Sequence, residues 1–137
     1  MRYTEIEHTA DLGVEIYGHT LEELFQNAGH ALFDTIADIT TVELKVERIV
    51  SVSGDDTESL MFNWLRELLY LFSVHEEIYA EFEIHSLHPT SIEARVRGEQ
   101  LDLEKHRFAT EIKAITYHQF EVSQKNNLWQ ARVVFDV

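Results

Sequence analysis

The sequence has no cysteine, one proline and five glycines among its 137 residues. Without cysteine, disulfide bonds and thiolate metal sites are excluded, which suits a reducing compartment such as the cytoplasm. No apolar run approaches the roughly 20 residues needed to cross a bilayer, and the first residues lack the apolar core of a signal peptide. We therefore expect a cytoplasmic protein with no membrane association and a single domain over residues 1–137.

Basic residues are also scarce. The chain has 11 Lys and Arg against 25 Asp and Glu, which gives a formal net charge of −14. Phosphate backbones are bound by Lys and Arg surfaces, so free RNA or DNA is not expected as a direct ligand. Three explanations of the acidity stay open: solubility, docking to a basic protein, and a divalent-cation site.

Signatures of known catalytic sites are missing from the sequence. It has no G-x-S-x-G elbow and no glycine-rich phosphate loop. Its eight histidines are dispersed, with no pair at ligand spacing on a predicted helix. We interpret them as ordinary surface histidines, and we expect a protein that is not itself an enzyme.

Apolar spacing predicts two helices between strands. Thr20 followed by Glu23 is typical of a capping box and starts a helix over residues 20–38. A second, more buried helix follows Asp55 and Asp56 and ends near His75. Alternating apolar residues predict strands over residues 3–6, 14–17, 42–52, 78–84, 92–96, 112–122 and 129–135. This order predicts an α+β fold, a mostly antiparallel sheet with two main helices packed on one face.

The last residues carry the strongest candidate site. Asp136 alternates away from the apolar side chains of Val133 and Phe135, and the α-carboxylate of Val137 lies one residue further on. Two carboxylates close together at a sheet edge repel each other unless a cation or a basic group lies between them. Hard cations such as Ca²⁺ and Mg²⁺ prefer such oxygen ligands. Many chains simply end in an acidic residue, so the pattern alone leaves both readings open.

Two further residues have an ordinary explanation beside a functional one. Asp11 lies in the turn sequence His8-Thr9-Ala10-Asp11-Leu12-Gly13, where an Asp usually accepts local backbone N–H bonds. Lys113 is a lone base beside an apolar strand, as an exposed strand lysine would be.

Four segments of the chain together resemble the archease family. They occur in the family's order and span nearly the whole chain. They are His8-Thr9-Ala10-Asp11, the Gly54-Asp55-Asp56 turn leading to Trp64-Leu65-Arg66-Glu67-Leu68-Leu69, Glu111-Ile112-Lys113-Ala114-Ile115-Thr116-Tyr117-His118, and Val134-Phe135-Asp136-Val137.

The resemblance implies a fold of the SHS2 kind and a role in tRNA splicing. Archease-like proteins activate the RtcB-type RNA ligase by promoting its guanylylation and its multiple turnover. By position, Asp11, Asp136 and Val137 match the family's metal-binding residues, which are associated with Ca²⁺, and Lys113 matches a lysine important for activation. The expected partner is therefore the ligase, with tRNA involved only indirectly.

Two other functions remain open from the residues. A metal-assisted phosphoesterase would use Asp11 and Asp136 to hold a cation that activates water. An acidic chaperone-like binding module would use the surface charge alone, so its activity would respond to ionic strength and not to chelators.

Overall fold

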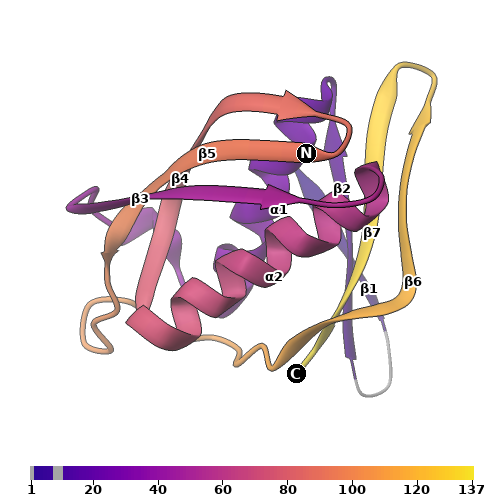
Figure 1. The fold of residues 1–137 in the computed structure, drawn as a ribbon. Coiled ribbons are helices and arrows are strands. Elements are labelled where there is room, and N and C mark those ends of the chain that lie inside the picture. Colours follow the sequence, from indigo (N-terminus) through magenta and orange to yellow (C-terminus); the bar gives the residue numbers. More distant parts are fainter. Residues whose placement is uncertain (1, 8–10) are drawn as a thin grey trace.

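A computed structural model describes residues 2–7 and 11–137 of the chain (Figure 1). These residues form two α-helices, a short 3₁₀ helix and seven strands. The elements are β1 (Tyr3–Glu7), β2 (Asp11–Gly18), α1 (Leu21–Ile36), η1 (Ile39–Thr41), β3 (Val46–Ser53), α2 (Thr57–His75), β4 (Glu77–His88), β5 (Ser91–Gln100), β6 (Ala114–Lys125) and β7 (Leu128–Asp136).

Side chains cap both α-helices at their first turn. The Thr20 hydroxyl accepts from the N–H of Glu23 at 3.1 Å, as predicted, while the Glu23 carboxylate accepts from the N–H of His19. Asp56 caps α2 by accepting from the N–H of Ser59 at 2.7 Å. These bonds satisfy amides that have no partner inside the helix. Neither of these helices has the length and apolar content needed to span a membrane.

The strands form two antiparallel sheets that enclose the helices. One sheet has the order β1-β2-β7-β6 and the other the order β3-β5-β4. Helix α1 contacts β2 and β4, and α2 contacts β6 and β3, so each helix packs against both sheets (Figure 1). The α+β class and both helices are confirmed. The structure differs from the expectation of one sheet with helices on one face, because β3, β4 and β5 pair only among themselves within the described residues.

The core lies where the two helices meet between the sheets. Trp64 of α2 is fully buried, and its indole N–H donates to the carbonyl of Phe25 in α1 at 3.0 Å. Gly29 of α1 faces the ring of Phe82 in β4, and a Cβ there would lie 2.7 Å from ring carbons. The missing side chain therefore allows the helix to approach the sheet closely.

Two local predictions had different outcomes. The strand predicted from residue 42 begins only at Val46, because Asp38 caps the 3₁₀ helix η1 and the chain turns there. The turn at the β6–β7 hairpin is confirmed. Asn126 and Asn127 have φ values of 53° and 63°, the left-handed conformation that Asn tolerates at a hairpin tip.

Candidate functional site

The structure brings Asp11 and Asp136 together at one end of the four-stranded sheet. Strand β2 begins at Asp11 and β7 ends at Asp136, and the two residues are directly opposite in the antiparallel register. Residues opposite each other share one face of a sheet, with Cβ atoms about 4.5–5.5 Å apart. The next pair, Leu12 and Phe135, points toward the core. The two carboxylates therefore lie side by side on the outer face.

Lys113 reaches the same end of the sheet through the segment that precedes β6. Its backbone N–H donates to the carbonyl of Asp136 at 2.7 Å, and the following residue, Ala114, is opposite Asp136 in the register. Further back, this segment is bonded to the end of α1, where the N–H of Ala109 donates to the carbonyl of Ile36 at 2.8 Å. The Lys113 side chain is exposed, next to the ends of the two strands that carry the carboxylates.

Among the described residues, neither carboxylate of this pair has a compensating partner. Within residues 2–7 and 11–137, the side chains of Asp11, Asp136 and Lys113 form no hydrogen bond or ion pair. Asp11 is the first residue of β2, and its carboxylate accepts no local N–H bond from the described residues, while residues 8–10 of the predicted turn lie outside them. Like charges directly opposite in a sheet repel. An unpaired carboxylate pair of this kind favours a bound cation.

The residues of the pair suit a hard cation with oxygen ligands. Asp11 and Asp136 would offer carboxylate oxygens, and Val137, 38% exposed and next in the chain, would offer main-chain oxygen. No group of three His, Asp or Glu side chains in the described part of the chain is arranged to hold a metal ion. Water would therefore complete the six to eight oxygen ligands that Ca²⁺ takes. His8 of the same predicted segment lies outside the described residues.

A second carboxylate, Glu99 near the end of β5, is buried and fully partnered. It is 5% exposed, and it accepts from Lys105 Nζ at 2.8 Å and from the N–H of Glu43 at 2.6 Å. Burial acts to raise its pKa, but the bonds from Lys105, from Glu43 and from His106 outweigh burial and lower the pKa to about 2. Glu99 ties the segment after β5 to the segment before β3, which is a structural role.

His106 belongs to this buried cluster and was not recognised from the sequence. It is 0% exposed, so the interpretation of all eight histidines as surface residues is wrong for it. Its Nδ1 accepts from the N–H of Asp102 at 2.9 Å, which leaves the ring proton on Nε2, 3.2 Å from Glu99. The surrounding segment is polar and irregular, so no periodicity marks the histidine as buried.

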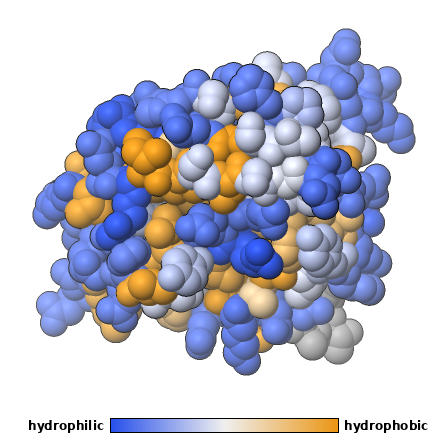
Figure 2. All heavy atoms as spheres, viewed as in Figure 1, coloured by the Kyte–Doolittle hydropathy of each residue, from blue (hydrophilic) through white to orange (hydrophobic). Residues whose placement is uncertain are grey.

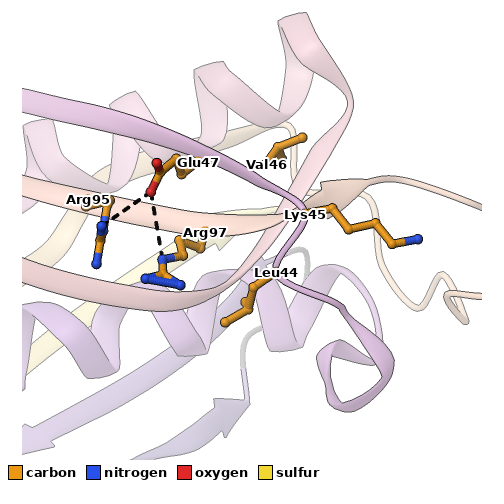
Figure 3. Close-up of a pocket in the computed structure, with 6 residues that line it drawn as sticks. All are labelled: Leu44, Lys45, Val46, Glu47, Arg95 and Arg97. Carbon is orange, nitrogen blue, oxygen red and sulfur yellow. Dashed lines mark ion pairs between the residues drawn. The ribbon is translucent and has the colours of Figure 1, made fainter.

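A shallow pocket of about 310 Å³ lies over β3 and β5 and contains two arginines (Figure 3). Arg95 and Arg97 both face Glu47, at 3.5 Å and 3.9 Å. Arg95 also pairs with Glu83 at 2.6 Å, and Arg97 pairs with Glu81 at 3.3 Å. Their charge is already neutralised within the sheet, so the pocket is not a free anion site.

The sequence model of the Archease protein family (MTH1598/TM1083) matches residues 3–137. The chain belongs to the archease family. The match includes both strands that carry the carboxylate pair and the segment that carries Lys113.

Individual archease proteins are similar to this chain over nearly its whole length. The chain is 42% identical to protein archease of Methanosarcina mazei, with 99% of this chain and 96% of that protein covered. It is 40% identical to protein archease of Pyrococcus abyssi, with 99% of each protein covered.

Two solved structures share the archease fold of this chain. The solution structure of Methanobacterium thermoautotrophicum protein 1598 has a TM-score of 0.86 at 32% identity and covers 99% of each chain. The crystal structure of a Thermotoga maritima protein, described as an archease and possible chaperone, has a TM-score of 0.67 at 26% identity, over 96% of this chain and 94% of that one.

Proposed function

We propose that this archease-family protein is an accessory protein that activates an RtcB-type tRNA-splicing RNA ligase. In this proposal it promotes guanylylation of the ligase and repeated turnover, by means of a divalent cation, Ca²⁺, held by Asp11, Asp136 and Val137. One observation carries the proposal. Two carboxylates from opposite ends of the chain are register partners on an outer face, without a cationic or hydrogen-bonding partner among the described residues.

Each residue has a distinct role in this proposal. Asp11 and Asp136 hold the cation from adjacent strands, and the main chain at Val137 adds an oxygen ligand. When bound, the cation supplies positive charge that attracts anionic phosphate groups. The exposed ammonium group of Lys113, on the segment bonded to Asp136, contacts the ligase or a phosphate at the same place. The net charge of −14 argues that tRNA is reached only through the ligase.

The test is ligation by a matched RtcB-type ligase, with RNA in large excess over enzyme so that many turnovers are required. We expect the parent protein to raise the number of turnovers, and Asp11→Ala and Asp136→Ala each to remove most of that increase. Asp55→Ala is the matched control, since Asp55 is an exposed Asp on the turn before α2. If both site variants activate as well as the parent, the metal-centred proposal is wrong.

A chaperone-like binding module is the second candidate, favoured by the high negative charge and by the description of the Thermotoga maritima relative as a possible chaperone. In that case activation would persist in a chelator and in both Asp variants, and it would fall as salt screens the surface charge. The metal-centred proposal predicts the opposite response to the chelator.

A further inference from the structure

Acidic residues are sparse on α2 after its first turn and on the segment leading into β6. Residues 59–75 and 112–120 contain one of the chain's 25 acidic residues, Glu67, together with the bases Arg66 and Lys113, and Glu58, Glu111 and Glu121 border these stretches. Helix α2 packs against β6, so these two stretches form one continuous face (Figure 1). General solubility would place acidic groups here as elsewhere, so the gap in the acidic surface needs another explanation.

Exposed apolar side chains lie along this acid-poor face. Tyr70 and Val74 of α2 are 57% and 53% exposed, and Tyr117 of β6 is 62% exposed. Arg66, Tyr70 and Val74 are spaced four residues apart and therefore line one side of the helix, and Phe62, one turn before Arg66, is 5% exposed and stacks with Tyr117. We call these four residues with Tyr117 the α2 stripe. In Figure 2, hydrophobic residues reach the surface over α2 among mostly hydrophilic ones.

An irregularity in β6 holds Tyr117 against the helix. The register steps from Thr116 opposite Val134 to Glu121 opposite Arg132, so residues 117–120 bulge out of the ladder. Gln119 in this bulge has φ of 56°, an uncommon conformation for a residue with a side chain. The result is a Tyr117 ring stacked on Phe62, with ring centroids 3.8 Å apart. Bulges often re-aim a side chain in this way near functional sites.

We infer that the α2 stripe is a docking surface for an apolar patch of a partner protein that presents a carboxylate to Arg66. Within the described residues, Arg66 has no ion pair, and its guanidinium carbon lies 5.8 Å from the centre of the Phe62 ring, so its charge is available. Tyr and Arg are enriched in protein interfaces and carry much of their binding energy. A face with few acidic groups repels an acidic, apolar surface less than the rest of this chain does.

The inference rests on the proposed function, since the partner it assigns is the ligase. Strand β6 connects the two regions directly. Lys113 lies at the carboxylate pair, immediately before Ala114, the first residue of β6. Tyr117 is four residues further on, which is about 13 Å at the usual rise per residue of a strand. A typical protein interface of about 800 Å² per partner is large enough to cover both the carboxylate pair and the α2 stripe. The ligase would then be held by the α2 stripe while its reacting groups lie at Asp11 and Asp136.

The test measures the affinity of a purified matched ligase by isothermal titration calorimetry, together with the activator concentration that gives half-maximal ligation. The double variant Tyr70→Ser, Val74→Ser changes two exposed side chains, so the fold should persist. We expect it to raise Kd and the half-maximal concentration at least about tenfold, with full activation at saturation. Arg66→Glu should raise both by a smaller factor. The control Ile49→Ser, on a 60% exposed residue of the other sheet, should change neither.

Other results would overturn the inference. If the double variant binds the ligase like the parent while the parent activates it, the stripe is not the docking surface and the proposed function stands. If the parent neither binds nor activates the ligase, the proposed function itself fails. Tyr117-dependent binding of single-stranded RNA by the free protein would make a nucleic acid the occupant. Sedimentation showing a dimer that the double variant loses would make a second copy the occupant.

Discussion

Two groups of carboxylates in this protein differ in how their charge is satisfied. Glu99 is buried and accepts bonds from Lys105 and from the N–H of Glu43, and its carboxylate lies 3.2 Å from Nε2 of His106. Asp11 and Asp136 are paired across two strands at a sheet end and accept none from the described residues. Both groups lie where separate parts of the chain come together.

The difference separates a structural cluster from a candidate binding site. A buried charge persists in a stable fold only when bonds replace the water it has lost, as they do at Glu99. The Asp11–Asp136 pair costs the fold some repulsion, and its carboxylates gain no hydrogen bond or ion pair from the described residues. An unfavourable arrangement of this kind is expected where a ligand supplies the missing interaction.

Removing the satisfied carboxylate should have the largest effect on folding. Glu99→Ala leaves the Glu43 N–H without its acceptor and removes the closer of the two carboxylates that Lys105 pairs with, the other being Glu43 at 3.5 Å. We expect a loss of about 3 kcal/mol in the free energy of unfolding, measured by urea denaturation. The matched control is Glu47→Ala, whose side chain is 58% exposed and pairs with two arginines on the sheet surface. It should change stability by less than about 1 kcal/mol. Equal losses in the two variants would contradict the comparison.

His30 tests what happens to a partly buried group without a partner. Its Nδ1 has no hydrogen bond in the described structure, and burial lowers the pKa of His30 from 6.5 to about 4. The unfolded chain therefore takes up the proton first as the pH falls. Stability should be complete above pH 6.5 and decline towards pH 4.

Replacing His30 should flatten that part of the stability curve. In the parent, we expect the free energy of unfolding to fall by about 1–2 kcal/mol between those pH values because of His30, a modest loss since the ring is only partly buried. His30→Leu should not show this loss, and urea denaturation at several pH values measures it. Glu99 does not contribute to this decline. Its pKa is lowered from 4.5 to about 2, so the stability that it contributes is lost only as the pH falls between those two values. If His30→Leu loses as much stability as the parent between pH 6.5 and pH 4, other groups cause the decline.

The unpaired carboxylates should show the smallest effect, with the opposite sign. In a chelator, Asp136→Asn removes the repulsion with Asp11 and should stabilise the protein by less than about 1 kcal/mol. Thermal unfolding of parent and variant in the same buffer measures the change. A clear loss of stability would mean that Asp136 has a structural role like that of Glu99.

The helices and the hairpin turn could be predicted because their signals are local. Thr20 and Asp56 cap helices with their own side chains, and Asn126 and Asn127 adopt the turn conformation that their type tolerates. The division into two sheets could not be predicted, because strand pairing depends on packing against both helices. The bulge at residues 117–120 also has no local signal.

The candidate site was predicted in part from residues and in part from resemblance. The alternation before Val137 predicts that Asp136 points away from the core, and Asp136 is partly exposed in β7, although Val134 on the same side of the strand is fully buried. The proximity of Asp11 depends on the register between β2 and β7, which connects residues at opposite ends of the sequence. His106 was missed because its segment is polar and irregular, so no periodicity marks it as buried beside Glu99.

Calcium binding by the isolated protein tests the central claim most directly. Isothermal titration calorimetry of the parent with CaCl₂ should show one ion bound per chain. Asp11→Asn and Asp136→Asn should each abolish the heat of binding, and the control Asp55→Asn should leave it unchanged. Binding that persists in both site variants, or a parent that binds no calcium at millimolar concentration, would contradict a metal site at the Asp11–Asp136 pair.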